Sequence, residues 1–113
     1  MAQADPARAV LWAATADWER PSAWPVAGRL LLTADRLLFT PRSGDEAWST
    51  PLERIVDVVV TEWPPSMGRG RRRKRIRIET TDGSVELFAV ATVSHAVDVI
   101  RVAVRAAGGD PSP

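Results

Sequence analysis

Short apolar runs separated by turn-forming residues recur along the 113-residue chain, and this rhythm is the feature that most limits how it can fold. Such runs, spaced about ten residues apart, are typical of an antiparallel all-β domain. Prolines between the runs cannot donate to a strand ladder and therefore indicate loops. The seven expected strands are residues 9–18, 29–33, 36–40, 46–50, 55–62, 73–80 and 84–90.

The turns between these runs have recognisable chemistry. Ala34-Asp35 is short enough for a tight hairpin, and residues 51–54 begin with proline and form a corner before the fifth run. Asp82-Gly83 separates the last two runs. Because an Asp-Gly pair tolerates positive φ, it predicts a type I′ hairpin at this position.

The sixth run alternates charged and apolar side chains. Arg75 and Arg77 alternate with Ile76 and Ile78, and successive strand residues point to opposite faces of a sheet. We therefore expect the isoleucines to face the core and the arginines to face water.

The last segment, residues 92–107, has apolar residues at both helical and strand spacing, and we favour a helix. Thr92 or Ser94 can cap its start, and Gly108 stands where a left-handed C-terminal cap belongs. The sequence thus predicts a mainly β fold closed by one C-terminal helix. Residues 8–107 are expected to form a single domain, with flexible termini at 1–7 and 108–113.

The composition excludes several classes of protein. There is no cysteine, and His95 is the only histidine, so neither a disulfide framework nor a histidine-based metal site is expected. We find no paired carboxylates, no Ser-His-Asp arrangement and no phosphate-binding glycine motif. The sequence therefore predicts a non-enzyme with no cofactor and no small-molecule substrate, and the lack of cysteine fits a cytoplasmic setting.

A set of spaced residues carries a family resemblance. The pattern is Gly28-x-Leu30-x-Leu32-Thr33-x-x-Arg36-Leu37-x-Phe39, followed by Pro51-Leu52-x-x-Ile55. With it, the chain resembles the GRAM and bacterial pleckstrin-homology-like (PH-like) families over about residues 8–107. The resemblance implies a seven-stranded, strongly bent antiparallel sheet, or partly open barrel, capped by the C-terminal helix.

The same resemblance implies an adaptor that binds phosphoinositides, other anionic lipids or peptides. Family members that bind phosphoinositides carry a Lys-xn-Lys/Arg-x-Arg signature across the first hairpin. Here residues 17–31 contain only Arg20 and Arg29, and no lysine. Some members use a second anion site between the first loop and the loop that joins strands five and six, and the most basic segment of this chain falls in that second loop.

That segment is unusually cationic. Seven of the nine residues in 69–77 are basic, whereas the formal net charge of the whole chain is only +1. The rest of the chain is therefore acidic overall, and the segment attracts polyanions over about 8–10 Å at physiological salt. We expect it to bind an anionic membrane surface or an acidic protein. The residues expected to supply charge are Arg69, Arg71, Arg72, Arg73, Lys74 and Arg75.

Three apolar side chains flank this segment or the first loop. Trp63 and Met67 precede the basic residues, and Trp24 lies in the first loop. An indole ring prefers the interface between lipid headgroups and water. We expect these three residues to insert at the membrane interface, with the protein peripheral to the inner face of the membrane.

Other interpretations of the same residues stay open. The arginines could belong to a solvated loop without a ligand, or bind nucleic acid through phosphates with little sequence preference. A different class of function is a protein-interaction scaffold that uses a sheet edge or the groove beside the helix. The other tryptophans, Trp12, Trp18 and Trp48, are expected in the core or the barrel wall, and His95 is expected at the surface or in a capping position.

Overall fold

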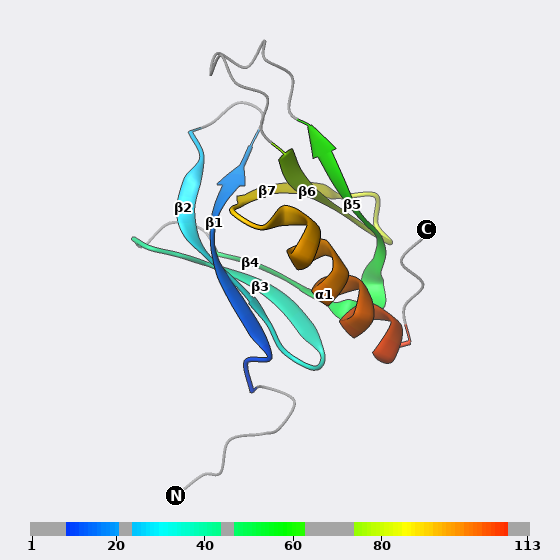
Figure 1. The fold of residues 1–113 in the computed structure, drawn as a ribbon. Helices are drawn as coiled ribbons and strands as arrows, with labels where there is room; N and C mark the ends of the chain where they lie inside the picture. The colour runs from blue at the N-terminus through cyan, green and yellow to red at the C-terminus, as the bar shows by residue number, and fades with distance from the viewer. Residues whose placement is uncertain (1–8, 21–23, 44–46, 63–73, 109–113) are drawn as a thin grey trace, which may run out of the picture.

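The structure is a computed structural model and describes residues 9–20, 24–43, 47–62 and 74–108. Seven antiparallel strands form one sheet in the order β4-β3-β2-β1-β7-β6-β5, and a single helix follows the last strand (Figure 1). The strands are β1 (Trp12–Glu19), β2 (Val26–Leu32), β3 (Arg36–Pro41), β4 (Trp48–Pro51), β5 (Ile55–Glu62), β6 (Lys74–Thr80) and β7 (Val85–Val90), and the helix is α1 (Val93–Ala106).

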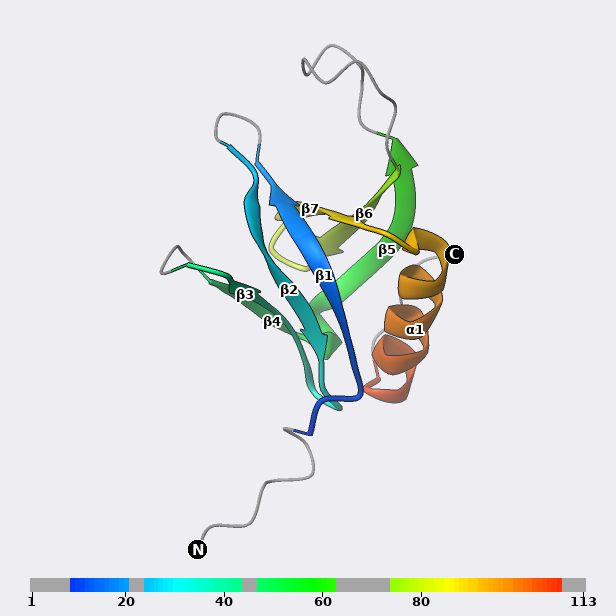
Figure 2. The same ribbon diagram turned by 60° about the vertical axis from the view of Figure 1, so that its left-hand side comes forward.

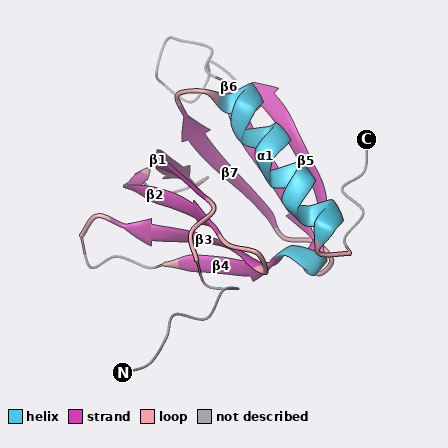
Figure 3. Ribbon diagram, turned by 60° about the horizontal axis from the view of Figure 1, so that its bottom comes forward, coloured by secondary structure: helices cyan, strands magenta, loops and turns pink. Residues whose placement is uncertain are grey.

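The sheet is bent, so that β1–β4 and β5–β7 lie at an angle to each other, and α1 lies beside β5–β7 (Figures 2 and 3). The two end strands, β4 and β5, are not paired with each other, so the sheet does not close. The predicted fold class, seven antiparallel strands in a bent, partly open sheet with one C-terminal helix, is confirmed. Among the described residues, no helix is both long and apolar enough to cross a bilayer.

The core follows from the alternation of side chains along the strands. Leu30 and Leu32 on β2 and Leu37 and Phe39 on β3 are fully buried, while the residues between them are partly or largely exposed. Phe88 on β7 completes this centre, with its ring centroid 5.7 Å from that of Phe39. Burying an aromatic or aliphatic side chain of this size contributes about 1.5–3 kcal/mol, so these residues hold the two halves of the sheet together.

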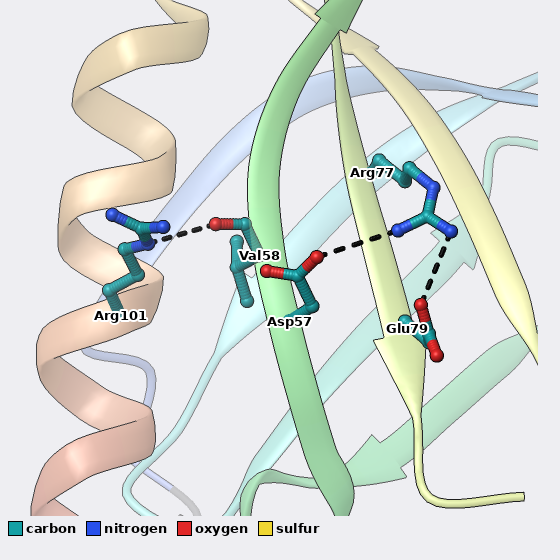
Figure 4. Close-up of polar contacts among 5 residues, drawn as sticks. All are labelled: Asp57, Val58, Arg77, Glu79 and Arg101. Atoms are coloured by element: carbon teal, nitrogen blue, oxygen red, sulfur yellow. Dashed lines mark hydrogen bonds and ion pairs between the residues drawn. The ribbon is translucent and has the colours of Figure 1, made fainter. Parts of the chain in front are cut away.

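Side chains on one face of the helix pack into the core of the sheet. Ala96, Val97, Ile100 and Val104 lie on one face of α1 and are buried. Arg101 extends from the helix to the edge strand β5, where its Nε donates to the carbonyl oxygen of Val58 at 2.9 Å (Figure 4). The helix is thus fixed to β5 by apolar packing and by one directed hydrogen bond.

The helix begins and ends at the capping residues that the sequence predicts. Thr92 is the N-cap residue, although its side chain makes no capping hydrogen bond. Gly108 adopts φ of +88°, and its N–H donates to the carbonyl oxygen of Arg105 at 3.1 Å. A side chain at that left-handed position would be strained, which is why glycine ends the helix there.

The turn between β6 and β7 differs from the expected type I′ hairpin. A type I′ turn needs positive φ at both central residues, but only Gly83 has it, at +86°. The N–H of Gly83 donates to the carbonyl oxygen of Thr80, and the N–H of Thr80 donates to that of Ser84. This pattern describes a three-residue loop that ends in a left-handed glycine. Asp82 keeps an ordinary φ because its carboxylate binds Thr80 and Ser84.

Candidate anion-binding site

The structure describes three of the nine residues expected to form the site. Lys74 and Arg75 begin β6, and Trp24 lies in the loop before β2. The other six lie outside the described residues. They are Trp63, Met67, Arg69, Arg71, Arg72 and Arg73.

Arg75 is buried, which contradicts the expectation that it points to water. Only 4% of its side chain is exposed. Its Nε donates to Glu19 Oε1 at 3.0 Å, and its Nη2 lies 2.9 Å from the same oxygen. Only 15% of the Glu19 side chain is exposed. A guanidinium held this way is neutralised by its partner. Arg75 is therefore a structural residue, and the expectation that it supplies free charge is wrong.

Arg77 is also neutralised inside the protein. Its Nη1 lies 3.5 Å from Asp57 Oδ2 on β5, and its Nη2 lies 3.2 Å from Glu79 Oε1 on β6 (Figure 4). One third of its side chain is exposed, so the expectation that it faces water is met only in part. The cationic segment available to a ligand therefore ends at Lys74.

The pair of Arg75 and Glu19 brings two loops together. Glu19 is the last residue of β1 and Arg75 is the second residue of β6. β1 and β5 end, and β2 and β6 begin, at the same end of the molecule (Figures 1 and 2). The ion pair therefore fixes the root of the first loop beside the root of the basic segment. Trp24, which is 84% exposed, and Lys74, which is exposed, lie at this end.

A hollow lies beside the root of the basic segment. Its volume is about 480 Å³, and its lining includes Thr15, Asp17, Lys74, Arg75 and Ala89. Ala89 is the partner of Asp17 across β1 and β7, so pairing of these two strands brings Asp17 and Ala89 to the same hollow. The sequence did not indicate this hollow, because it depends on β1 pairing with a strand about seventy residues later.

The tryptophans expected in the core lie there. Trp18 is 6% exposed, and its Nε1 donates to Glu86 Oε1 at 3.0 Å. Trp12 and Trp48 are partly buried against the core, and Trp48 lies 5.3 Å from the Phe88 ring. These indoles are occupied by packing, so Trp24 is the tryptophan with a largely exposed ring among the described residues.

Chemistry typical of metalloenzymes has no visible basis in the described ranges. They contain no group of three or more histidine, cysteine, aspartate or glutamate residues placed to hold a metal ion. His95 is exposed in the first turn of α1, the surface position that was expected.

Among the described acidic residues, Asp82 has a lowered pKa. Hydrogen bonds from the Thr80 hydroxyl, at 2.5 Å, and from the N–H of Ser84, at 3.0 Å, lower its pKa from 3.8 to about 2. Because the folded state holds the carboxylate more strongly than the unfolded chain does, its contribution to stability is complete above about pH 4 and is lost as the pH falls towards 2.

We therefore expect Asp82→Asn to have a lower melting temperature than the parent protein at pH 6, with the difference narrowing towards pH 2. Thermal unfolding across this range measures it. Asp98→Asn, which removes an exposed carboxylate on α1, is the matched control. Its difference in melting temperature from the parent protein should not narrow as the pH falls from 6 to 2. A constant difference between the Asp82 variant and the parent at every pH would show that the charge is not responsible.

Comparisons with known proteins concern the fold. No family model matches the sequence, and no curated protein matches it either. A crystal structure of the C-terminal domain of an unknown protein from Leishmania infantum is similar, with a TM-score of 0.73 and 15% identity over 86% of this chain and 84% of that one.

Crystal structures of the DH/PH domains of p115-RhoGEF are also similar. One has a TM-score of 0.58 and 15% identity, and the match covers 92% of this chain but only 32% of that chain. A truncated linker-DH/PH form has a TM-score of 0.56. At such identities the likeness shows the fold alone, so the resemblance to the GRAM family stays a prediction. The open, bent sheet of seven antiparallel strands with its C-terminal helix is thus a PH-like fold.

Proposed function

We propose that the chain is a non-catalytic PH-like binding module. It is recruited to anionic membrane surfaces through the basic segment between β5 and β6. The charged residues that act in this proposal are Arg69, Arg71, Arg72, Arg73 and Lys74. Trp24, Trp63 and Met67 insert at the interface, and the setting is the cytoplasmic face of the membrane. A PH-like fold supports a binding role, since its neighbours include the PH domain of an exchange factor.

The observation that carries the proposal is the buried pair of Arg75 and Glu19. It holds the start of the basic segment beside the end of β1, from which the loop of Trp24 continues. A largely exposed indole and a run of cations at one end of a molecule are suited to a surface of anionic headgroups above an apolar layer.

The expected strength follows from the number of cations proposed to act. Each lysine or arginine near an anionic membrane contributes about 1 kcal/mol. Five such residues contribute about 5 kcal/mol before the cost of ordering the segment, and Arg75 and Arg77 add nothing because carboxylates already neutralise them. Binding should therefore be weak, reversible and sensitive to salt.

Vesicle co-sedimentation tests this proposal. We expect binding to vesicles of phosphatidylcholine to rise as phosphatidylserine is added, and to fall when salt is raised from about 0.1 M to about 0.5 M, because screening shortens the range of surface charges. The variant Arg71→Glu/Arg72→Glu/Arg73→Glu should lose most of this binding. Arg75 is left intact in the variant, since its replacement would disturb the fold rather than the surface.

Matched variants separate the segment from general charge effects. Arg54→Glu/Arg105→Glu reverses two exposed arginines elsewhere and should keep most of the binding. Trp24→Ser should weaken it while leaving its dependence on salt unchanged. Full binding by the triple glutamate variant would remove the segment from the mechanism. Parallel titrations with single-stranded DNA and polyglutamate are decisive too. If the chain binds either polymer more tightly than the vesicles, that polymer's class, and not the membrane, is the ligand.

A further inference from the structure

The outer face of β1–β4, meaning the side chains of these strands that point away from the core, carries a row of apolar residues. Ala13 on β1 is opposite Leu31 on β2, and Leu31 is opposite Leu38 on β3. Leu11 lies two residues before Ala13 and is 61% exposed. The helix packs against β5, β6 and β7 instead (Figure 3), and no described element covers this row.

Three arginines flank the row. Arg29 lies two residues before Leu31, and Arg36 lies two residues before Leu38, at the other side of the row. Arg42 follows β3, and its N–H donates to the carbonyl oxygen of Ala27. Within the described residues, none of the three guanidinium groups is paired with a carboxylate. Arg36 Nη2 donates to the hydroxyl of Ser49 at 3.1 Å.

The acidic side chains of this face do not balance the arginines. Glu19 is on the outer face of β1 but is held by Arg75. Asp17 is then the one carboxylate of the described strand residues on this face that no arginine is seen to neutralise. Asp35, in the turn before Arg36, is a second anion near the row, and its carboxylate accepts a hydrogen bond from the Thr33 hydroxyl. Three cations against these two anions, around an apolar row, make a surface complementary to an acidic and partly apolar partner.

A shallow hollow gives this surface a shape. It has a volume of about 290 Å³, and its lining includes Arg29, Leu31, Thr40, Pro41 and Arg42. Its lining is mostly apolar and includes the side chains of two arginines. A glutamate side chain fits such a place, because its methylene groups contact the floor while its carboxylate contacts the arginines.

From this arrangement we infer that the outer face of β1–β4 docks an acidic amphipathic helix of a partner protein. The face of a sheet offers no backbone hydrogen bonds, since these lie within the sheet. A segment that lies on it must satisfy its own backbone, as a helix does. The inference goes beyond the proposed function, because it uses another surface and another ligand.

The spacing suits a helix that crosses the strands. Neighbouring strands are about 4.8 Å apart, so the apolar row spans about 10 Å from β1 to β3, which is about seven residues of helix. Apolar residues at i, i+3 or i+4, and i+7 of the partner lie over the row. Its flanking carboxylates then lie about 6–7 Å to either side, two residues along each strand. Arg29 meets one flank and Arg36 meets the other, and Arg42, four residues beyond Leu38 along the chain, lies further out on the side of Arg29.

The probe for this inference is a synthetic 18-residue helical peptide with a leucine stripe flanked by glutamates. A scrambled peptide of identical composition lacks the stripe. Titration of the isotope-labelled full chain by NMR should shift the amide signals of Ala13, Leu31 and Leu38, and the scrambled peptide should bind at least about tenfold more weakly. Arg29→Gln/Arg42→Gln should weaken binding about tenfold, as expected when charge-assisted hydrogen bonds are lost.

Leu38→Ser tests the apolar row and should also weaken binding about tenfold. Its matched control is Val102→Ser on the exposed side of α1, and Arg105→Gln is the control for charge. Both controls should bind within about twofold of the parent protein. Well-dispersed spectra establish that each variant is folded.

The inference is overturned if the scrambled peptide binds equally well, if the controls lose as much as the test variants, or if the shifts map to the start of β6 instead. The Arg71→Glu/Arg72→Glu/Arg73→Glu variant should still bind the helical peptide. The membrane proposal and this inference therefore fail independently of each other.

Discussion

Replacement of Arg75 by methionine is expected to lower the free energy of unfolding by about 3–5 kcal/mol, because it leaves the largely buried carboxylate of Glu19 without its partner. A domain of this size has a total stability of about 5–15 kcal/mol. The variant should therefore unfold at a much lower urea concentration or fail to fold at ordinary temperature. Equilibrium urea denaturation, followed by tryptophan fluorescence, measures the loss.

Two comparisons identify the cause of this loss. The double variant Arg75→Met/Glu19→Met removes both charges together and should recover most of the stability, because an apolar pair can replace a buried ion pair at little cost. Arg77→Gln removes a partly exposed arginine from neighbouring carboxylates and should cost less than about 1 kcal/mol. A loss below about 1 kcal/mol in the single Arg75 variant would show that the ion pair is not a structural tie.

Gly28→Ala is the second substitution with a large expected effect. A Cβ atom at this position would overlap the carbonyl oxygen of Thr40, and it would lie 2.7 Å from Phe39 Cζ and 2.9 Å from Pro41 Cα. Two of these atoms belong to the backbone of β3 and cannot turn away as a side chain can. Overpacking costs about 1–3 kcal/mol, and we expect a loss of about 3 kcal/mol, measured by urea denaturation.

The cause should be the close approach of β2 and β3 at Gly28, and the Phe39 ring reports on it. We expect the NMR signals of Phe39 to shift strongly in Gly28→Ala. Thr15→Ala, on the exposed outer face of β1, should change the stability by no more than about 0.5 kcal/mol. Parent-like stability of Gly28→Ala would mean that β2 and β3 separate at this position without cost.

The strands were predictable from the sequence because each one is defined by its own residues. The apolar run between two turns identified β3 with almost correct limits, and the β-branched run at Val58 identified β5, whose limits agree at both ends. The start of β2 was missed by three residues. Val26 lies directly after Pro25, and proline indicates a loop, yet pairing with Trp18 on β1 draws Val26 into the sheet.

The role of Arg75 could not be predicted in the same way. Alternation with Ile76 correctly placed it on the outer face of β6, but the sequence contains no signal that this face is covered there. Its partner Glu19 is 56 residues away. The two meet only because β7 pairs with both β1 and β6. A contact that depends on the order of strands in a sheet is not written in the local pattern of either strand.

Neutralisation of Arg75 and Arg77 also changes how the charge of the chain should be understood. Residues 69–77 look like one uniform cationic block in the sequence, but its last part already has carboxylate partners within the fold. Conversely, Arg29, Arg36 and Arg42 are scattered along the sequence, and antiparallel pairing of β2 with β3 brings them onto one face. In a sheet, charged residues that are neighbours in the sequence need not form one charged surface, and charged residues that are distant in the sequence can.

The hydrogen bond from Arg101 to Val58 has a consequence for self-association. An edge strand is a template to which a strand of another chain can pair. Proteins protect such edges with charge or with a covering element. Here the guanidinium occupies a main-chain acceptor that an incoming strand would need, and it carries a positive charge to the same place. Arg101 of the C-terminal helix thereby makes the addition of another strand at β5 less favourable.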